Sequence, residues 1–290
     1  MIHWNADPEL IHLGFITIRW YGLLFSLSFL TGYAVLAETF RDEGVSEIHL
    51  DRLLMVLGIG TIVGARLGHC LFYEPEIYLA DPIRILKVWE GGLASHGAAV
   101  GIFTALAYYS RRYHLGYLWL CDRVCMGVAL AGGWVRLGNL FNSEIVGRPT
   151  NVPWAFVFER VDLLPRHPAQ LYESLSYFAI FGILYRVFWN TQLRRKSGAM
   201  VGLMLCLTFT VRFFLEFVKE NQVSFESHLP LDMGQLLSIP LVLGGLVLLL
   251  RPRKVLDVTS KASEDLDSAD LEPKPDNSRK KSRASRKQKT

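Results

Sequence analysis

Long apolar runs alternate with short polar connections along the first 250 residues of the chain. A helix needs about 20 mostly apolar residues to cross the roughly 30 Å hydrocarbon core of a bilayer, and seven runs reach or approach that length. The predicted spans cover residues 16–40, 53–72, 93–110, 118–141, 168–189, 199–217 and 235–250. The pattern predicts an all-α integral membrane protein, a bundle of seven transmembrane helices within a single domain of residues 1–250.

The connections between these spans predict interfacial segments and one long loop. The first 15 residues, with Trp4, have the character of a segment at the membrane interface. Residues 74–92 contain Pro75, Pro82 and the amphipathic run IRILKVW, which favours a helix lying along the surface. Residues 142–169 form the longest connection, and loops of that length are more often functional than idle. We expect this loop to face the periplasm.

The net positive charge of the chain comes from its last 40 residues. The chain is 51% hydrophobic and 20% charged, with a net charge of +4. Residues 251–290 hold twelve Lys and Arg against seven Asp and Glu, which leaves 19 basic and 20 acidic residues in the rest. We predict a disordered, basic, cytoplasmic tail that is attracted to anionic lipid. Nucleic-acid binding is not expected for a tail attached to a membrane bundle.

The basic residues also predict an orientation. Lys and Arg gather in alternate short connections, and the positive-inside rule then places the carboxyl terminus inside and the amino terminus outside. At 1.5 Å per residue, Arg66, Arg136 and Arg212 lie roughly 20, 27 and 20 Å along spans that run outward. Tyr21, His96 and Glu173 lie near the starts of spans that run inward. Six polar residues from six helices therefore share the outer half of the bundle, as one site would require.

The stretch GGWVRLGNLFNSEIVGRP at 132–149 places charged groups at the end of an apolar helix. Arg136 and Asn139 are three residues apart and share a helical face. Charged side chains inside a membrane usually face a partner, the bundle interior or a cavity, and a guanidinium fork suits phosphate or carboxylate. The stretch therefore indicates an anion site at the membrane surface. The alternative is a helix end whose polar side chains extend to water.

The other candidate residues each allow a structural and a functional interpretation. Arg212 and Glu216 are four residues apart and favour an ion pair inside the bundle, although spare guanidinium donors could also bind a lipid phosphate. Tyr21 has the position of an aromatic-belt anchor. His96, in SHGAA, is either a hydrogen-bonded structural residue or a proton acceptor. Glu173 allows three interpretations: a carboxylate exposed at a helix start, a partner of Arg166, or a group that orients a base.

The four cysteines all fall in apolar runs and are interpreted as core residues. Cys121 and Cys125 lack the close ligand spacing and the accompanying histidine of metal sites. The sequence therefore gives no indication of a bound metal.

The run RLGNLFNSEIVG at 136–147 resembles the signature of the bacterial prolipoprotein diacylglyceryl transferases. The resemblance continues through RWYG at 19–22, GARLG at 64–68, VWEGGLASHG at 88–97, LPRHPAQLYE at 164–173, VRFFLEF at 211–217 and MGQLLSIP at 233–240. It implies a seven-span enzyme of the bacterial cytoplasmic (inner) membrane that acts without metal or cofactor. This enzyme moves the diacylglyceryl group of phosphatidylglycerol to the lipobox cysteine thiol of a prelipoprotein signal peptide. The products are a thioether and glycerol phosphate, in the first step of lipoprotein maturation.

The resemblance also implies a set of site residues. Family positions carry over to Tyr21, His96, Arg136, Asn139, Glu144, Gly147, Arg212 and Glu216. We expect His96 to accept the thiol proton, Arg136 and Arg212 to clamp the phosphate, and Asn139 and Tyr21 to orient the headgroup. Glu144 and Glu216 are expected to hold the arginines. The residues expected to bind substrate are Arg66, Arg136, Asn139, Glu144, Gly147, Glu173, Arg212 and Glu216.

Two other classes of protein could also use intramembrane charges. A lipid or anion transporter would place arginines and carboxylates in a bundle, but the chain has no obvious internal repeat of the kind that transporters show. A structural or assembly subunit would tolerate alanine at Asn139. A covalent lipid product distinguishes the transferase from both.

Overall fold

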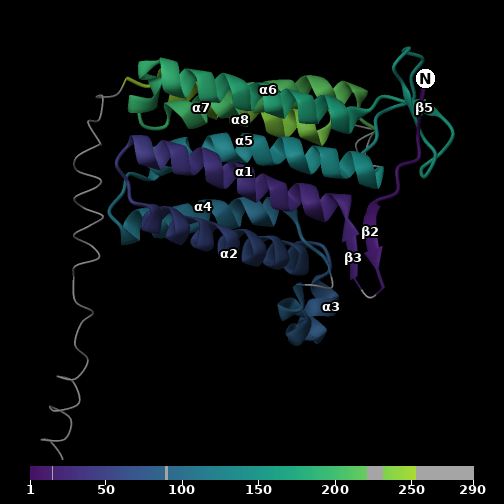
Figure 1. Ribbon diagram of the computed structural model, residues 1–290, viewed down its shortest axis with the longest axis horizontal. Helices are drawn as coiled ribbons and strands as arrows, with labels where there is room; N and C mark the ends of the chain where they lie inside the picture. Colours follow the sequence, from purple (N-terminus) through teal and green to yellow (C-terminus); the bar gives the residue numbers. More distant parts are fainter. Residues whose placement is uncertain (15, 89–90, 221–230, 253–290) are drawn as a thin grey trace, which may run out of the picture.

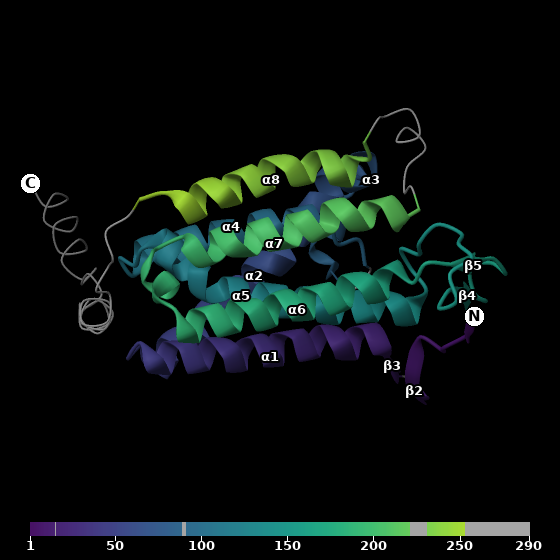
Figure 2. The same ribbon diagram turned by 90° about the horizontal axis from the view of Figure 1, so that it is seen from above.

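The computed structural model describes residues 1–14, 16–88, 91–220 and 231–252, and within them seven long helices lie side by side (Figure 1). These helices are α1 (Trp20–Asp42), α2 (Glu47–Phe72), α4 (Ser95–Arg112), α5 (Tyr117–Asn142), α6 (Ala169–Asn190), α7 (Ala199–Leu215) and α8 (Met233–Leu250). They form three layers, with α6, α7 and α8 on one side, α1 and α5 in the middle, and α2 and α4 on the other side (Figures 1 and 2).

Five of the described helices are long and apolar enough to cross a membrane: α1, α2, α5, α7 with its 3₁₀ extension η4 (Glu216–Val218), and α8. The helices α4 and α6 have 18 and 22 residues but do not meet the combined criteria of length, apolarity and few charges. The chain is a multi-pass helical membrane protein, and the count of seven spans stays a prediction.

Two helices begin away from the starts of the predicted spans. The first span was expected from residue 16, but α1 begins at Trp20, because Ile16–Arg19 forms strand β3 and pairs antiparallel with β2 (Glu9–Leu13). The second was expected from residue 53, but α2 begins at Glu47, because the polar run EIHLDR continues the helix beyond its apolar part. The other five agree to within two residues at each end. The predicted surface helix is instead two short pieces, α3 (Pro75–Ala80) and η1 (Pro82–Leu86).

Glycines bring two pairs of helices into backbone contact. A Cβ atom on Gly64 of α2 would lie 2.7 Å from the Cα of Gly101 on α4. A Cβ on Gly202 of α7 would lie 2.8 Å from the carbonyl oxygen of Gly245 on α8. The absence of side chains at these positions allows close approach, which is the usual means of packing helices in lipid. Gly60 and Gly68 of α2 face α4 in the same way as Gly64.

A small sheet lies against the end of the bundle where α1 and α6 begin and α5 ends (Figures 1 and 2). Strand β1 (Ile2–Trp4) runs parallel to β4 (Phe156–Phe158), which pairs antiparallel with β5 (Pro165–Arg166). Trp4 packs with Phe156 and Phe158, and its indole Nε1 donates to the carbonyl of Leu140 on α5 at 3.1 Å. The long connection of residues 142–169 is therefore ordered and fixed to the helix ends.

The opposite end of the bundle is held by buried polar contacts. Arg123 of α5 is 3% exposed, and its Nε donates to a carboxylate oxygen of Glu43 at 2.9 Å. Asp122 accepts a hydrogen bond from the backbone N–H of Val201 in the first turn of α7, at 2.9 Å. The predicted disordered tail lies outside the described residues, except for positions 251 and 252.

Candidate active site

The candidate site begins where α5 ends. Ser143 and Ile145 both have φ of 56°, in the left-handed region that residues other than glycine adopt infrequently. These two residues turn the chain back over the last turn of the helix. As a result the Glu144 N–H donates to the carbonyl of Asn139 at 3.0 Å, and the Asn139 amide donates to the Glu144 carboxylate at 3.1 Å. The loop thereby fixes the amide of Asn139, which is 6% exposed.

Arg136 is fixed by two neighbours but keeps donors available. Its Nη1 donates to the side-chain oxygen of Asn139 at 3.3 Å, and its Nε lies 2.8 Å from a carboxylate oxygen of Glu173 on α6. Glu173 is 2% exposed, so this ion pair lies inside the protein. A guanidinium has five N–H donors in a planar fork, and two remain after these contacts and a hydrogen bond with the hydroxyl of Tyr177.

Lys219, just after η4, extends this pair into a chain of alternating charges. Its Nζ lies 3.5 Å from the second carboxylate oxygen of Glu173 and 3.2 Å from a carboxylate oxygen of Glu216. Lys219 is 4% exposed. The sequence Arg136, Glu173, Lys219, Glu216 is named here the charge chain. It connects α5, α6 and η4, and each carboxylate in it contacts a cation.

Arg212 is the cation of this region with the most donors available. It lies in the last turn of α7, is partly buried, and has no hydrogen-bond or ion-pair partner within the described residues. The hydroxyl of Tyr177, on α6, interacts with Arg136, Glu173 and Arg212. Both guanidinium groups thus act electrostatically on one phenol, and both have donors that suit an anion.

Tyr21 lies beside the same cluster at the start of α1. Its ring packs directly against Gly138 of α5, where an added Cβ would lie 2.7 Å from the ring. Its hydroxyl interacts electrostatically with Glu144 and Arg136. Tyr21 therefore lies beside the candidate site as well as at a helix start. Its position in the sequence did not distinguish a site residue from an aromatic-belt anchor.

Gly147 packs where no side chain fits. A Cβ there would lie 2.5 Å from the carbonyl oxygen of His167 and 2.8 Å from that of Val218. Its N–H donates to the His167 carbonyl at 3.0 Å, and Gly147 pairs with Lys219 in a β-bridge. This glycine joins the loop after α5 to the segments before α6 and after α7, which carry the rest of the charge chain.

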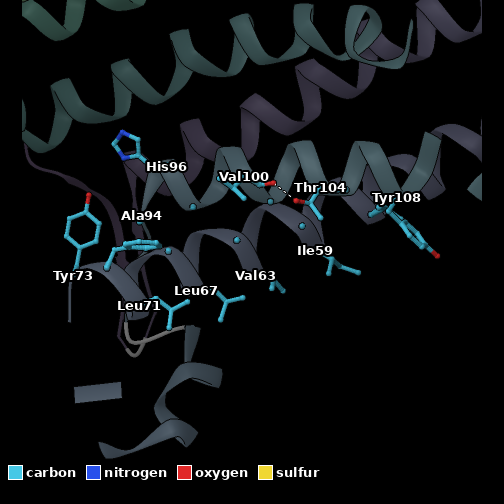
Figure 3. Close-up of a pocket in the computed structure, with 18 residues that line it drawn as sticks. Ile59, Val63, Leu67, Leu71, Tyr73, Ala94, His96, Val100, Thr104 and Tyr108 are labelled. Carbon is cyan, nitrogen blue, oxygen red and sulfur yellow. Dashed lines mark hydrogen bonds between the residues drawn. The ribbon is translucent and has the colours of Figure 1, made fainter. Parts of the chain in front are cut away.

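His96 lies at the start of α4, apart from the contacts described above. It is exposed and, in the described part of the chain, has no hydrogen-bond or ion-pair partner. It borders an apolar groove of about 1090 Å³ along α2 and α4, which also includes Tyr73, Val63 and Leu67. In Figure 3 the imidazole points away from Leu67 and Val63, at the end of the groove near Tyr73. Its imidazole nitrogens are available to a substrate.

Arg66 is buried, and its guanidinium binds backbone carbonyls. It is 2% exposed, and its Nε donates to the carbonyl of Ile85 at 3.0 Å. Its other nitrogens donate to the carbonyls of Gly91 and Arg84, and its guanidinium lies over the ring of Tyr78. The expected role in substrate binding does not fit these contacts, because the donors are used to hold the segment between α2 and α4.

The expected arginine partners of Glu216 and Glu144 were wrong, and one of the three interpretations of Glu173, a pair with Arg166, does not hold. Glu216 pairs with Lys219 and not with Arg212, although Arg212 is one helical turn before it. Glu173 pairs with Arg136, whereas Arg166 pairs with Asp162 and Glu220.

Glu144 likewise binds amides instead of an arginine. Its carboxylate accepts from Asn139 and Asn142, so it reaches Arg136 only through Asn139.

Two site residues were missed. Lys219 was not singled out from the sequence, although its spacing of three from Glu216 allowed a pair. Tyr177 lies four residues after Glu173 and shares its helical face, a spacing that could have indicated it. Neither spacing is specific, because both are common on helices outside functional sites.

Comparisons with known proteins agree with this geometry. The helical layers and the buried charges at one end define a polytopic membrane protein with a cationic site near its surface. Residues 8–251 match the family model "Prolipoprotein diacylglyceryl transferase", and the chain belongs to this family.

Three relatives carry the name phosphatidylglycerol–prolipoprotein diacylglyceryl transferase. The protein from Chloroherpeton thalassium is 50% identical over 254 residues, 87% of this chain and 95% of the relative. The protein from Tolumonas auensis is 50% identical over 255 residues, 88% of this chain and 98% of the relative. The protein from Bacteroides fragilis is 43% identical over 257 residues, 84% of this chain and 93% of the relative.

Proposed function

We propose that this chain transfers the diacylglyceryl group of phosphatidylglycerol to the lipobox cysteine thiol of a prelipoprotein signal peptide. The observation that carries the proposal is Arg212, a partly buried guanidinium with no partner within the described residues, which acts electrostatically on Tyr177 together with Arg136. Phosphatidylglycerol has an anionic phosphodiester, and a planar guanidinium binds such a group through paired hydrogen bonds. Family membership and the names of the relatives support the same reaction.

The reaction forms one carbon–sulfur bond and breaks one carbon–oxygen bond. The cysteine attacks as the thiolate. Its sulfur bonds to the carbon of the diacylglycerol that carries the phosphate ester, and the electrons of the broken carbon–oxygen bond leave with the phosphate oxygen. The departing glycerol phosphate gains charge, which Arg136 and Arg212 stabilise. Fixed donors aimed at developing charge are often the largest contribution to catalysis, and the Glu173 contact at 2.8 Å fixes Arg136 before substrate arrives.

The remaining residues take supporting roles in this proposal. His96 accepts the thiol proton, because its imidazole is exposed and unpartnered in the described part of the chain. Asn139 and Tyr21 orient the headgroup beside Arg136, and Gly147 allows the loop to pack there.

The site lies at the outer face of the bacterial inner membrane in this proposal. The end of the bundle with the charge chain is the end at which the positive-inside rule puts fewer basic connections. The amino terminus is then outside and the basic tail in the cytoplasm, so the site meets secreted prelipoproteins.

The direct test is a mass-spectrometric transfer assay. The purified protein is incubated with phosphatidylglycerol micelles and a lipobox peptide, beside a matched peptide with serine in place of cysteine. We expect a diacylglyceryl mass on the cysteine peptide alone, together with released glycerol phosphate. Arg212→Ala lowers the rate by about 10²–10³-fold, as expected for loss of a donor to a developing oxyanion, whereas Arg41→Ala, at a residue 77% exposed, keeps the parental rate. Folded parent protein that forms no adduct contradicts the proposal and favours a transporter or structural subunit.

A further inference from the structure

Arg212 is separated from the carboxylate that lies one helical turn after it. The N–H of Glu216 donates to the carbonyl of Arg212, so the helical turn continues from α7 into η4. Side chains four residues apart in such a turn lie on one face, and an arginine and a glutamate at this spacing ordinarily form an ion pair. Arg212 nevertheless has no hydrogen-bond or ion-pair partner in the described part of the chain. Other groups must therefore hold the Glu216 carboxylate.

Lys219 is the cation that contacts this carboxylate. Its Nζ lies 3.2 Å from one oxygen of Glu216 and 3.5 Å from one oxygen of Glu173. The side chains of Lys219 and Glu216 are 4% and 13% exposed, so solvent ions screen the pair little. Glu173 also pairs with Arg136. The charge chain thus uses both of its carboxylates on two other cations and leaves the Arg212 guanidinium out.

The start of α8 contacts the same carboxylate. A Cβ on Gly234, the second residue of α8, would lie 2.5 Å from the carboxylate carbon of Glu216. The backbone of this buried glycine therefore packs directly against the carboxylate. The first turn of a helix has free N–H groups and a partial positive charge, which favour a carboxylate. Lys219 and the start of α8 thus hold Glu216 together.

Arg148 fixes these two groups relative to each other. Its Nε donates to the carbonyl of Lys219 at 2.7 Å, and its Nη2 lies 3.3 Å from a carboxylate oxygen of Asp232. Asp232 is the N-cap of α8 and forms a capping box with Gln235. One guanidinium therefore joins the backbone of Lys219 to the first turn of α8. The position of the Glu216 carboxylate is set by the protein alone, before any substrate is present.

We propose that Lys219 is a positioning residue that keeps Glu216 away from Arg212, so that the Arg212 guanidinium stays available to the phosphate of the lipid. The inference rests on the proposed function, because the phosphate is that of phosphatidylglycerol. Lys219 acts through Glu216 and not by contact with the lipid. Without its ammonium group, Glu216 pairs with the arginine on its own helical face, and the lipid phosphate must displace this carboxylate in order to bind.

The effect of Lys219→Met in two backgrounds tests this role. KM for phosphatidylglycerol and kcat are measured for Lys219→Met, for Glu216→Gln and for the double variant. In the parental background we expect KM to rise about 10–100-fold, the range of one competing charged hydrogen bond. We expect kcat to fall by less than about threefold, because saturating lipid displaces the carboxylate.

In the Glu216→Gln background the same change should raise KM by less than about threefold, because a neutral amide competes weakly for the guanidinium. Lys219→Arg keeps the charge and should restore KM to near the parental value. A residue that only stabilises the fold would lower the active fraction, and hence kcat, in both backgrounds. Equal rises of KM in the two backgrounds, or a loss confined to kcat, overturn the inference.

A second variant displaces Glu216 without removing a charge, and it decides the question if Lys219→Met does not fold. Gly234→Ala adds a methyl group 2.5 Å from the Glu216 carboxylate and moves it from its place beside Lys219. The matched control is Gly244→Ala, also on α8, where an added Cβ meets nothing within 4 Å. We expect KM to rise about tenfold in Gly234→Ala alone. A parental KM in Gly234→Ala, or an equal rise in the control, overturns the inference.

Chemical labelling of Arg212 makes the test independent of turnover. Phenylglyoxal reacts with available guanidinium groups, and mass spectrometry compares the labelling of Arg212 with that of Arg41, whose side chain is 77% exposed. We expect Arg212 to react several-fold more slowly in Gly234→Ala and in folded Lys219→Met than in the parent, and to recover in the double variant. Equal labelling in all of these proteins overturns the inference. Absence of transfer by the unaltered protein contradicts only the proposed function.

Discussion

Replacing Glu173 with glutamine tests whether the charge chain orients Arg136. The change keeps the size of the side chain but removes the charge that contacts Arg136 Nε at 2.8 Å and Lys219 Nζ at 3.5 Å. Because Glu173 is 2% exposed, water cannot replace the lost charge at either cation.

The structure sets the expected size of the effect. Removing one partner of a buried ion pair costs about 3–5 kcal/mol when the other charge is left unpaired. Here both cations keep a contact, because Arg136 still donates to Asn139 and Lys219 still pairs with Glu216. We therefore expect a loss near that of a charged hydrogen bond, about 2–3 kcal/mol. At about 2–4 °C per kcal/mol, the midpoint of thermal unfolding falls by about 4–12 °C.

Transfer activity falls together with stability, but for a separate reason. A guanidinium released from Glu173 no longer points at the phosphate, and misplacement of a binding group by about 1 Å costs about 10²-fold in rate. The assays are thermal unfolding in detergent and peptide lipidation below the midpoint of both proteins. The control is Glu159→Gln, the same chemical change at a carboxylate that is 34% exposed and pairs with His3. If both variants lose similar stability and activity, the orienting role of Glu173 is refuted.

Three further predictions concern the packing and charge around the site. Gly147→Ala places a methyl group 2.5 Å from the His167 carbonyl, and we expect it to lower the free energy of unfolding by about 1–3 kcal/mol and to abolish transfer. Denaturant titration measures this loss, with Gly182→Ala as the control because nothing lies within 4 Å of an added Cβ there. Gly101→Val separates α2 from α4 and lowers the unfolding midpoint by more than Gly58→Val, an open position on α2. The hydrogen bond from Arg166 holds the pKa of Asp162 below its ordinary value, so the pair adds stability above that value and loses it as pH falls through the lowered pKa. Unfolding midpoints measured below about pH 4 should therefore fall more steeply in the parent than in Asp162→Asn.

The helices could be predicted from sequence because lipid imposes a strong pattern. Any segment that crosses the hydrocarbon must be apolar and long, and five of the seven expected ranges agree with the structure to within two residues. Hydrophobicity alone could not give the starts of α1 and α2, because it does not distinguish strand from helix at 16–19 and does not detect the polar first turn of α2.

The residues that lie together in the candidate site were easier to predict than the ion pairs among them. Arg136, Asn139 and Glu144 lie within nine residues, and local geometry brings them together. The ion partners come from other helices, so they depend on how α5, α6 and η4 rotate against one another. The contact of Glu173 with Arg136 and Lys219 is of this kind.

Arg66 was expected to bind substrate, but its contacts are structural. Its position along α2 suggested a place in the site, but its donors bind backbone carbonyls that the sequence could not place beside it. Depth along a helix therefore predicts the level of a residue in the membrane and not the face on which it lies.

The most direct test of the two-arginine site is a double-mutant cycle in the transfer assay. Rates are measured for Arg136→Ala, Arg212→Ala and the double variant, with phosphatidylglycerol and the lipobox peptide. Two groups that bind one phosphate act as a unit, and the losses of such groups do not multiply. The account predicts that the double variant is slower than the slower single variant by less than about tenfold. Losses that multiply in full would place the two arginines on separate groups and contradict the shared phosphate site.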